Sequence, residues 1–415
     1  QMIKCGSYTG NQSATGPVVN LGWEPQWLMV KQTTLVADPA DWIIVDNMRG
    51  WATGSADARL YANSSGAENS TEIGIDITST GFKLTTNSEQ TNKNNAQYIY
   101  MAIRAPMMVE PSAATDVFAI DRPSSSGTLT VESGFPIDLV MVKGPSAGNA
   151  NYTGTRLTGK TLYPHTNGAE FAVGHSFDFN DKTTIAGSGD YSAWISWMWK
   201  RAKGFFDVVA YTGDTNSGRT VAHSLGVAPE MMWVKCRTDT TSWMVYHAAL
   251  TSYKYLTLDT NAAAVTHNGN WYNTDPTDSV FTVGDGATNV AQNQIAYLFA
   301  TVAGVSKVGS YIGNGTSGRT IDCGFSAGAR FILIKGATNT ESWYVFDSVR
   351  GIVARPAGNP FSPYAYGLDA KLQLDNTSQE FTNEDLVDPA NSGFIVNTSN
   401  AVNASGVTYI FYAIA

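Results

Sequence analysis

Charge is scarce in this chain. Only 15% of its 415 residues are charged, whereas globular proteins average about 25%. The net charge is −9, and Lys and Arg form no cluster of the kind that neutralises a nucleic-acid backbone. The sequence therefore predicts no nucleic-acid partner and a surface built mainly from uncharged polar groups.

Long apolar runs and helical periodicity are missing as well. No stretch approaches the roughly 18 apolar residues that a membrane-spanning helix needs, so we expect no membrane insertion. No useful segment shows the 3.6-residue apolar period of an amphipathic helix. In contrast, 39 glycines and many Ser, Thr and Asn residues favour turns and strands. With 43% hydrophobic residues the chain can bury a core, so disorder is not expected.

Cysteine and histidine are sparse. Cys5, Cys236 and Cys323 are widely spaced, which argues against a disulfide framework and fits assembly in a reducing cytoplasm. The five histidines make no metal-binding signature. An acidic segment at 178–181, followed by Asp190, lacks the spacing of a calcium-binding loop. We therefore expect no metal site and no cofactor.

The chain repeats itself. Residues 211–247 and 311–347 align without a gap at an offset of 100 residues. A third copy begins at Tyr8, and a weaker one lies near Gly134. Each copy holds an apolar run that ends in Lys: WLMVK, LVMVK, MMWVK and FILIK. Such repetition indicates tandem structural units. We predict four units, at 1–105, 106–203 (the divergent one), 204–303 and 304–415.

The apolar runs have the length of β-strands. A polar loop follows, and then a second β-prone run such as WIIVD, WMVYH or WYVFD, which is typical of a hairpin. Regularly spaced strands with Gly, Asn and Ser turns indicate β-sandwiches. The sequence therefore predicts an all-β fold of about four tandem, jelly-roll-like β-sandwich repeats of roughly 100 residues each.

An Asp-x-x-Arg-Gly motif occurs twice. Its residues are Asp46, Arg49 and Gly50 in the first unit and Asp347, Arg350 and Gly351 in the last. An Asp and an Arg three residues apart can pair around a turn, with Gly supplying a positive φ. The motif could bind a ligand or brace the turn. Because a structural brace should recur in a repeated fold and a unique site should not, we interpret both motifs as structural turn clamps.

Tryptophans in loop-like segments are candidate platforms for stacking against sugars. We predict Trp23, Trp51 and Trp271 as ligand-binding residues on this basis. The tryptophans that open strands are expected in the core: Trp42, Trp243 and Trp343. We also expect Trp197 and Trp199, which share one face of a strand, to close a sandwich.

No residues are assigned to catalysis. His223, His247 and Cys236 lie in one unit and could suggest a Cys–His nucleophile. However, the matching positions of the last unit hold Cys323, Asp347 and Gly336. No acidic pair suited to glycoside hydrolysis stands out either. We expect a protein that is not an enzyme.

Several segments resemble repeats of a known family. These are FDVVAYTGDTNSGRTVAHSLGVAPEMMWVK, GSYTGNQSATGPVVNLGWEPQWLMVK and the terminal TYIFYAIA. They are similar to repeats of large virion surface proteins of tailed phages, especially marine and cyanobacterial ones. The resemblance covers nearly the whole chain and is weakest at about 106–190. It implies concanavalin-like jelly-roll modules in tail fibres and other appendages, and it carries no catalytic residues.

Three functions agree with these observations. The leading hypothesis is a structural virion surface protein, a tail fibre or similar appendage assembled in the host cytoplasm. It would contact other virion proteins and a glycan or protein on the host surface. The alternatives are a capsid decoration protein or head fibre, and a cell-surface lectin or carbohydrate-active enzyme. Exposed edges of an all-β repeat chain and the symmetry of appendages predict a homo-oligomer, and the tail-fibre analogy predicts a trimer.

Overall fold

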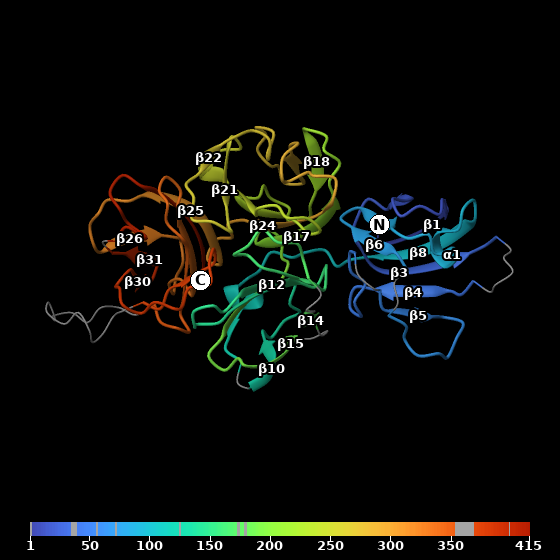
Figure 1. The fold of residues 1–415 in the computed structure, drawn as a ribbon, viewed down its shortest axis with the longest axis horizontal. Coiled ribbons are helices and arrows are strands. Elements are labelled where there is room, and N and C mark those ends of the chain that lie inside the picture. The colour runs from blue at the N-terminus through green and yellow to red at the C-terminus, as the bar shows by residue number, and fades with distance from the viewer. Residues whose placement is uncertain are drawn as a thin grey trace.

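The strands form four successive β-sandwiches of closely similar topology (Figure 1). The computed structural model describes residues 2–34, 40–54, 57–70, 73–123, 126–171, 175–177, 181–352, 369–397 and 399–415. Each sandwich pairs a large antiparallel sheet with a smaller one. The prediction of an all-β fold made of about four tandem sandwich units is confirmed.

In the first sandwich the large sheet has the order β1-β8-β3-β4-β5 and the small sheet the order β2-β7-β6. The elements are β1 (Ile3–Thr9), β2 (Val18–Asn20), β3 (Pro25–Gln32), β4 (Ile43–Asp46), β5 (Arg59–Tyr61), β6 (Ile75–Thr78), β7 (Gly81–Leu84), α1 (Glu89–Asn92) and β8 (Gln97–Arg104). Burial alternates along β8, so that Tyr98, Tyr100 and Ala102 lie inside the sandwich, as expected for a strand with one core-facing side.

The second sandwich has the same strand order, although its sequence is divergent: β9-β16-β11-β12-β13 and β10-β15-β14. The elements are η1 (Ala114–Asp116), β9 (Phe118–Asp121), β10 (Ser126–Glu132), β11 (Leu139–Lys143), β12 (Asn151–Thr155), β13 (Thr161–Leu162), β14 (His175–Phe177), β15 (Lys182–Asp190) and β16 (Ile195–Trp199). Lys143 pairs with Asn151, as Lys335 of the last sandwich pairs with Trp343. Asn151 therefore replaces the strand-opening Trp that the sequence pattern lacks here.

The third sandwich differs in one strand. Its elements are β17 (Phe206–Thr212), β18 (Arg219–Ala222), β19 (Met231–Cys236), β20 (Met244–His247), η2 (Ala248–Leu250), β21 (Lys254–Thr257), β22 (Val265–Thr266), β23 (Val280–Val283) and β24 (Asn293–Phe299). The large sheet has the order β17-β24-β19-β20-β21-β22, and the small sheet pairs β18 with β23. The sixth strand of the unit thus joins the large sheet instead of the small one.

The fourth sandwich returns to the common pattern, with the orders β25-β32-β27-β28-β29 and β26-β31-β30. Its strands are β25 (Ser306–Ile312), β26 (Arg319–Asp322), β27 (Phe331–Gly336), β28 (Trp343–Asp347), β29 (Leu372–Gln373), β30 (Val387–Ala390), β31 (Gly393–Val396) and β32 (Thr408–Ile414). The last strand lies between the first and the third in every unit, which makes all these pairings non-local.

The second, third and fourth sandwiches surround a common centre, and we call these three the ring. In Figure 1 their large sheets lie toward the centre and their small sheets toward the outside, while the first sandwich lies beside the ring. We call the face of a large sheet that points away from its own small sheet the outer face. In the ring, the three outer faces pack against one another.

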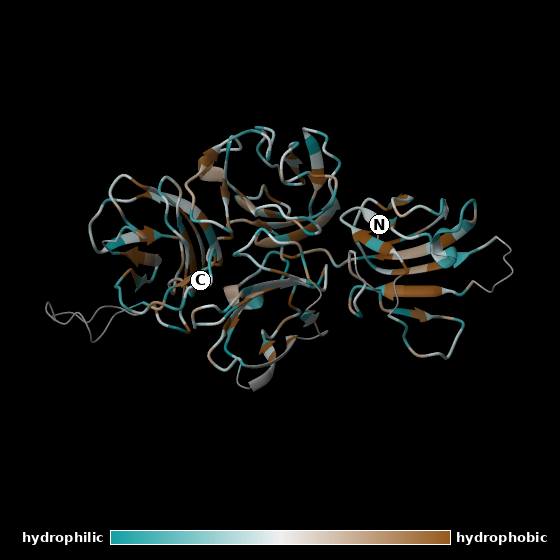
Figure 2. Ribbon diagram, in the orientation of Figure 1, coloured by the Kyte–Doolittle hydropathy of each residue, from teal (hydrophilic) through white to brown (hydrophobic). Residues whose placement is uncertain are grey.

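Because of this arrangement, the central strands of the large sheets in the ring are buried on both faces. All residues of β11, β16, β19 and β27 are buried, and the inward strands are rich in hydrophobic residues (Figure 2). Aromatic rings cross the seams: Phe118 lies 5.3 Å from Phe331, and Phe299 lies 5.1 Å from Tyr412, between ring centroids. Trp197 and Trp199 contact Phe331 of the fourth sandwich. Both are buried, as expected of residues that close a sandwich, but they lie on the outer face of their sheet and pack against the neighbouring sandwich.

Candidate functional site

Both Asp-x-x-Arg-Gly turns hold the same ion pair. Arg49 Nε lies 2.7 Å from Asp46 Oδ2, and Arg350 Nε lies 2.6 Å from Asp347 Oδ2. In each turn the other carboxylate oxygen accepts the backbone N–H of the arginine at 2.9 Å. Gly50 and Gly351 follow with φ of +107° and +121°, a region that favours glycine. Each turn is thus held by its own side chains.

The clamps also tie the turn to the rest of the sandwich. Arg49 Nη1 pairs with Glu68 at 3.1 Å, and Arg350 Nη1 pairs with Glu380 at 3.0 Å. In the last unit the pair is buried and faces the ring: the indole N–H of Trp197 donates to Asp347 Oδ2 at 3.2 Å. Each guanidinium is thus held by contacts within its own sandwich, as expected of a structural clamp.

The three tryptophans predicted to bind ligand do not form an exposed surface. Trp51 is 0%, Trp271 1% and Trp23 8% exposed. The Trp51 indole N–H donates to the carbonyl oxygen of Ile75 inside the first sandwich, and Trp271 packs edge-on against Tyr246. The stacking prediction is corrected, because these loops fold into the sandwich and use the indole as core.

A repeated polar contact joins the sandwiches of the ring. The indole N–H of Trp343 donates to the carbonyl oxygen of Thr257 at 2.9 Å, and that of Trp243 donates to Tyr163 at 3.0 Å. Asn151, which takes the place of Trp in the second sandwich, donates to Gln373 at 3.4 Å. The acceptors are equivalent, since Tyr163, Thr257 and Gln373 occupy the same register position beside the fourth strand. The contacts run from fourth to third, third to second and second to fourth sandwich, and so close the ring.

The lysines that end the apolar runs are buried at these seams. Lys143, Lys235 and Lys335 are all 0% exposed, and burial lowers the pKa of each from 10.5 to about 8. Their ammonium groups donate to main-chain carbonyls. Lys143 reaches Asn376 at 3.0 Å and Lys335 reaches Asn261 at 3.2 Å, each in another sandwich. Lys143 and Lys335 therefore link two sandwiches through the main chain, whereas Lys235 donates to the carbonyl oxygens of Cys236 and Asp239 in its own sandwich.

An ionic junction attaches the first sandwich to the ring. The Arg201 guanidinium binds both oxygens of Glu24 at 2.7 and 3.0 Å, and its Nε lies 2.7 Å from Asp207. Glu24 belongs to the first sandwich, whereas Asp207 opens the third. Bidentate pairs of this kind fix orientation as well as contact.

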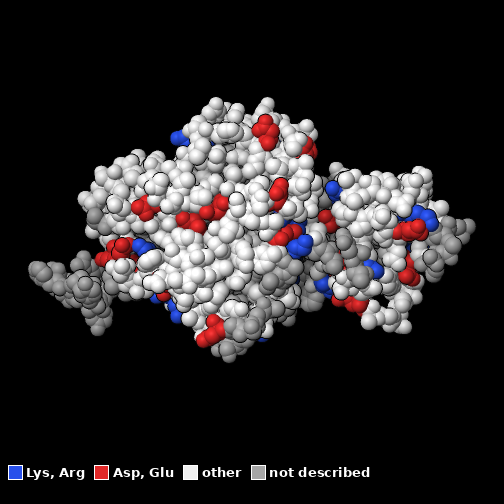
Figure 3. Space-filling view, in the orientation of Figure 1, with Lys and Arg blue, Asp and Glu red and all other residues white. Residues whose placement is uncertain are grey.

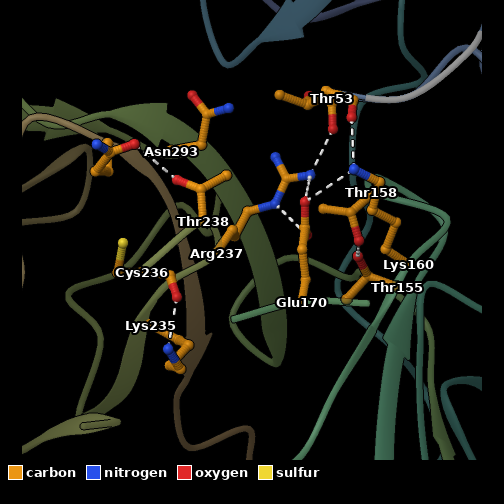
Figure 4. Close-up of polar contacts among 12 residues, drawn as sticks. Thr53, Thr155, Thr158, Lys160, Glu170, Lys235, Cys236, Arg237, Thr238 and Asn293 are labelled. Carbon is orange, nitrogen blue, oxygen red and sulfur yellow. Dashed lines mark hydrogen bonds and ion pairs between the residues drawn. The ribbon is translucent and has the colours of Figure 1, made fainter. Parts of the chain in front are cut away.

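A second ionic junction lies nearby and joins three sandwiches (Figure 4). Arg237 is fully buried; its Nε donates to Glu170 at 2.8 Å and its Nη2 to the carbonyl oxygen of Thr53 at 2.6 Å. Lys160 lies 3.2 Å from Glu170 and donates to the carbonyl oxygen of Gly54 at 2.8 Å. Several of the chain's few charged residues thus lie where sandwiches meet, and the face in Figure 3 shows scattered charges.

Sequence reasoning missed a buried asparagine that recurs in three units. Asn92, Asn289 and Asn403 are each 0% exposed. Each side-chain oxygen accepts a backbone N–H from the loop after the first strand, and each amide donates to carbonyls of that loop. The spacing before the closing strand varies among the units, so a fixed-offset alignment does not bring these residues together.

The fourth sandwich has a groove between its first two strands, β25 and β26, at the edge where the two sheets separate. It encloses about 410 Å³ and is lined by Lys307, Tyr311, Arg319 and Asp322 among others. The Arg319 guanidinium lies over the Tyr311 ring at 5.3 Å. Gly309 leaves room for the Phe411 ring, because a Cβ there would lie 2.5 Å from that ring. Such a groove offers donors and acceptors to a hydroxyl-rich ligand.

The described residues offer little else for site chemistry. Within them, no group of three or more His, Cys, Asp or Glu side chains could hold a metal ion. Residues 178–180 of the acidic segment considered as a calcium loop lie outside the described residues. His247 is buried at a seam, where burial lowers its pKa to about 4. No helix in the described ranges is long and apolar enough to cross a membrane.

Comparison with known proteins gives a family and no function. A family model described as "Domain of unknown function (DUF7483)" matches residues 2–106 and 123–415. No curated protein matches the chain. The first matched range ends two residues after β8 closes the first sandwich, and the second covers most of the ring. The chain therefore belongs to the family described as Domain of unknown function (DUF7483).

Proposed function

We propose that the chain is a structural protein of a tailed-phage virion surface, a tail fibre or similar appendage that contacts the host surface. The observation that carries the proposal is the shared core of the ring. Large apolar interfaces remove the relative motion that separate domains normally keep. Three sandwiches locked in this way form a rigid block, which suits a part that bears load and displays loops.

The use of polar chemistry supports the same view. Glu170, Arg237 and Arg201 form ion pairs between sandwiches. In this proposal they hold the sandwiches together and take no part in catalysis. The sequence segments that resemble phage appendage repeats support the virion location. Other virion proteins and further copies of the chain are the partners in this proposal.

Host contact in this proposal occurs through weak glycan binding in the fourth-sandwich groove. Lys307, Arg319 and Asp322 line it with charged donors and an acceptor. Thr320 and Asp322 are exposed on its rim. We expect glycan affinity to fall when Arg319 is changed to Ala, with the fold unchanged.

Labelling of intact particles tests the location. Antibodies against the purified chain should decorate virions from a culture that produces it, at the tail end, in negative-stain electron micrographs. Label at the capsid would favour the alternative of a decoration protein or head fibre. Absence of label from all particles would overturn the proposal.

A turnover assay tests the remaining alternative. We expect the purified chain to release no sugar from host-surface polysaccharide. Release that is lost on changing a single carboxylate to its amide would establish a carbohydrate-active enzyme instead, and would refute a purely structural role.

A further inference from the structure

The outer face of the first sandwich corresponds, residue by residue, to the faces that build the ring core. In every sandwich the lysine that ends the apolar run pairs with an isoleucine of the closing strand. The four pairs are Lys31 with Ile99, Lys143 with Ile195, Lys235 with Ile295, and Lys335 with Ile410. The strand order is the same as well. The first sandwich therefore presents the same surface in the same register.

That surface is covered in three units and open in one. Ile195, Ile295 and Ile410 are each 1% exposed, whereas Ile99 is 41% exposed. Across the rest of the first outer face, Ile3 is 50% and Leu60 36% exposed, and Met29 and Met101 are only partly buried. A contiguous apolar sheet face left open in this way marks an interaction site.

The composition of this face fits a protein interface. Its apolar positions are Ile3, Trp27, Met29, Ile44, Leu60, Ile99, Met101 and Ile103. Lys31 donates to the carbonyl oxygen of Ala40, and Asp46 is paired with Arg49. Depletion of free charge and enrichment in Met and aromatic residues are typical of interface cores. Several copies could approach one another without like-charge repulsion.

The first sandwich also retains the group that joins neighbours in the ring. The backbone N–H of Trp42 donates to the Asn63 side chain, as those of Trp243 and Trp343 donate to Asp259 and Asp375. In the ring, the indole N–H of this Trp binds the neighbour's carbonyl beside the fourth strand. The equivalent carbonyl in the first sandwich belongs to Tyr61. Among the described residues, the Trp42 indole N–H has no hydrogen-bond acceptor in its own chain.

We propose that this face is a trimerisation surface, covered by the first sandwiches of two further copies of the same chain. Head-to-tail contacts of this kind form a closed ring only if their rotation closes. The ring inside the chain shows that the rotation set by this sheet closes with three members. In the trimer, Trp42 of each chain donates to Tyr61 of the partner subunit.

The rest of the chain leaves this face available. The first sandwich is attached to the ring through Glu24, Thr53 and Gly54 and through contacts of β6 with β17. These residues lie at loops and on the small sheet, not on the outer face of the large sheet. The proposal stands on the chain alone and does not depend on a location in a virion.

Sedimentation equilibrium of the full chain tests it. We expect a species of three times the 44.5 kDa chain mass that dissociates to single chains on dilution. Ile99→Glu should abolish the trimer while leaving the circular dichroism spectrum unchanged, because Ile99 is already exposed in the single chain. Val18→Glu is the matched control, since Val18 is 61% exposed on the small sheet, and it should remain trimeric.

Two further readouts keep the test decisive if Ile99→Glu does not fold. Trp42→Phe should raise the trimer dissociation constant by about tenfold or more, since each subunit loses a buried hydrogen bond. Cys5, which lies on the same face, should react slowly with a thiol reagent in the trimer and quickly after dilution. A wild-type chain that stays monomeric or dimeric at every concentration would overturn the proposal. So would a Val18→Glu variant that dissociates as readily as Ile99→Glu.

Discussion

The side-chain amide of Asn151 donates to the carbonyl oxygen of Leu374 at 2.8 Å across 223 residues of sequence. It also reaches the carbonyl oxygens of Gln373 and Asn376, and its own oxygen accepts a hydrogen bond from Lys143 at 2.6 Å. One side chain thus satisfies several buried groups where the second sandwich meets the fourth. The seam that closes the ring depends on it.

Removing this amide should destabilise the ring. We expect Asn151→Ala to lower the free energy of unfolding by about 2–4 kcal/mol, because it leaves buried carbonyl oxygens without a donor and removes one of the acceptors of the Lys143 ammonium. Denaturant unfolding followed by tryptophan fluorescence measures the loss. The control is Asn216→Ala in an exposed turn, which should stay within about 0.5 kcal/mol of the wild type. Equal effects of the two changes would contradict the role given to Asn151.

The Glu24–Arg201 pair should couple the first sandwich to the ring. A double-mutant cycle with Glu24→Ala and Arg201→Ala should give a coupling energy of about 1–3 kcal/mol, since the pair is bidentate and largely buried. The exposed pair of Lys93 with Glu89 provides a comparison and should couple by about 0.5 kcal/mol or less. Small-angle scattering should also show a larger radius for Glu24→Ala, and an unchanged radius and zero coupling would refute the assignment.

Stability should rise with pH between about 8 and 9. The pKa of Lys143, Lys235 and Lys335 is lowered from 10.5 to about 8 by burial, so in this window the unfolded chain binds more protons than the folded one. Each lysine then adds up to about 1.4 kcal/mol per pH unit. Below this window both states are protonated and the lysines add no slope. Chemical denaturation at several pH values measures the effect.

A variant isolates the contribution of one lysine. Lys335→Met should show a smaller rise in stability over the same pH range, whatever its absolute stability. Above about pH 9 the slope should reverse, because burial raises the pKa of many tyrosines, such as Tyr297, and of the Cys323 thiol, and only the unfolded chain then loses those protons. A flat profile from pH 8 to 9 in the wild type would contradict the burial of the lysines.

One thiol of the three should be reactive in dilute native protein. Cys5 is exposed, whereas Cys236 and Cys323 are buried, and burial raises the pKa of Cys323 to about 12. Because the thiolate is the reactive species, a disulfide reagent at pH 8 should modify Cys5 alone until the chain unfolds. The change in absorbance counts the thiols, and Cys5→Ser should remove the fast phase. Two fast thiols would show that a buried cysteine is accessible.

Local patterns were sufficient to predict the sandwiches. Runs such as MMWVK carry their strand length and β propensity in adjacent residues, and the repeat multiplies the signal. The ring could not be predicted in the same way. A strand such as β19 is apolar on both sides, and this pattern does not distinguish a second sheet from a neighbouring sandwich. The fourth strand of the second unit was missed because Asn151 replaces the marker Trp.

For the candidate sites too, contacts between residues close in sequence are predictable and contacts between sandwiches are not. The Asp347–Arg350 clamp is predictable because its partners are three residues apart. Arg237 and Glu170 are 67 residues apart and belong to different sandwiches, so nothing local joins them. The tryptophan prediction failed for a related reason. Trp51 follows a strand in a polar segment, yet its loop folds into the sandwich. Only the hydrogen bond from its indole N–H to the carbonyl oxygen of Ile75 shows this inward orientation.

A ring of three sandwiches within one polypeptide is free of the constraint that identical subunits impose. In a homotrimer every substitution appears three times, so a change that helps one seam alters all of them. Here the second sandwich carries Asn151 where the others carry Trp, and the fourth sandwich has a groove between β25 and β26. Because the three sandwiches are covalently linked but differ in sequence, the outward-facing part of each sandwich can change independently. The shared core meanwhile preserves the arrangement of the ring.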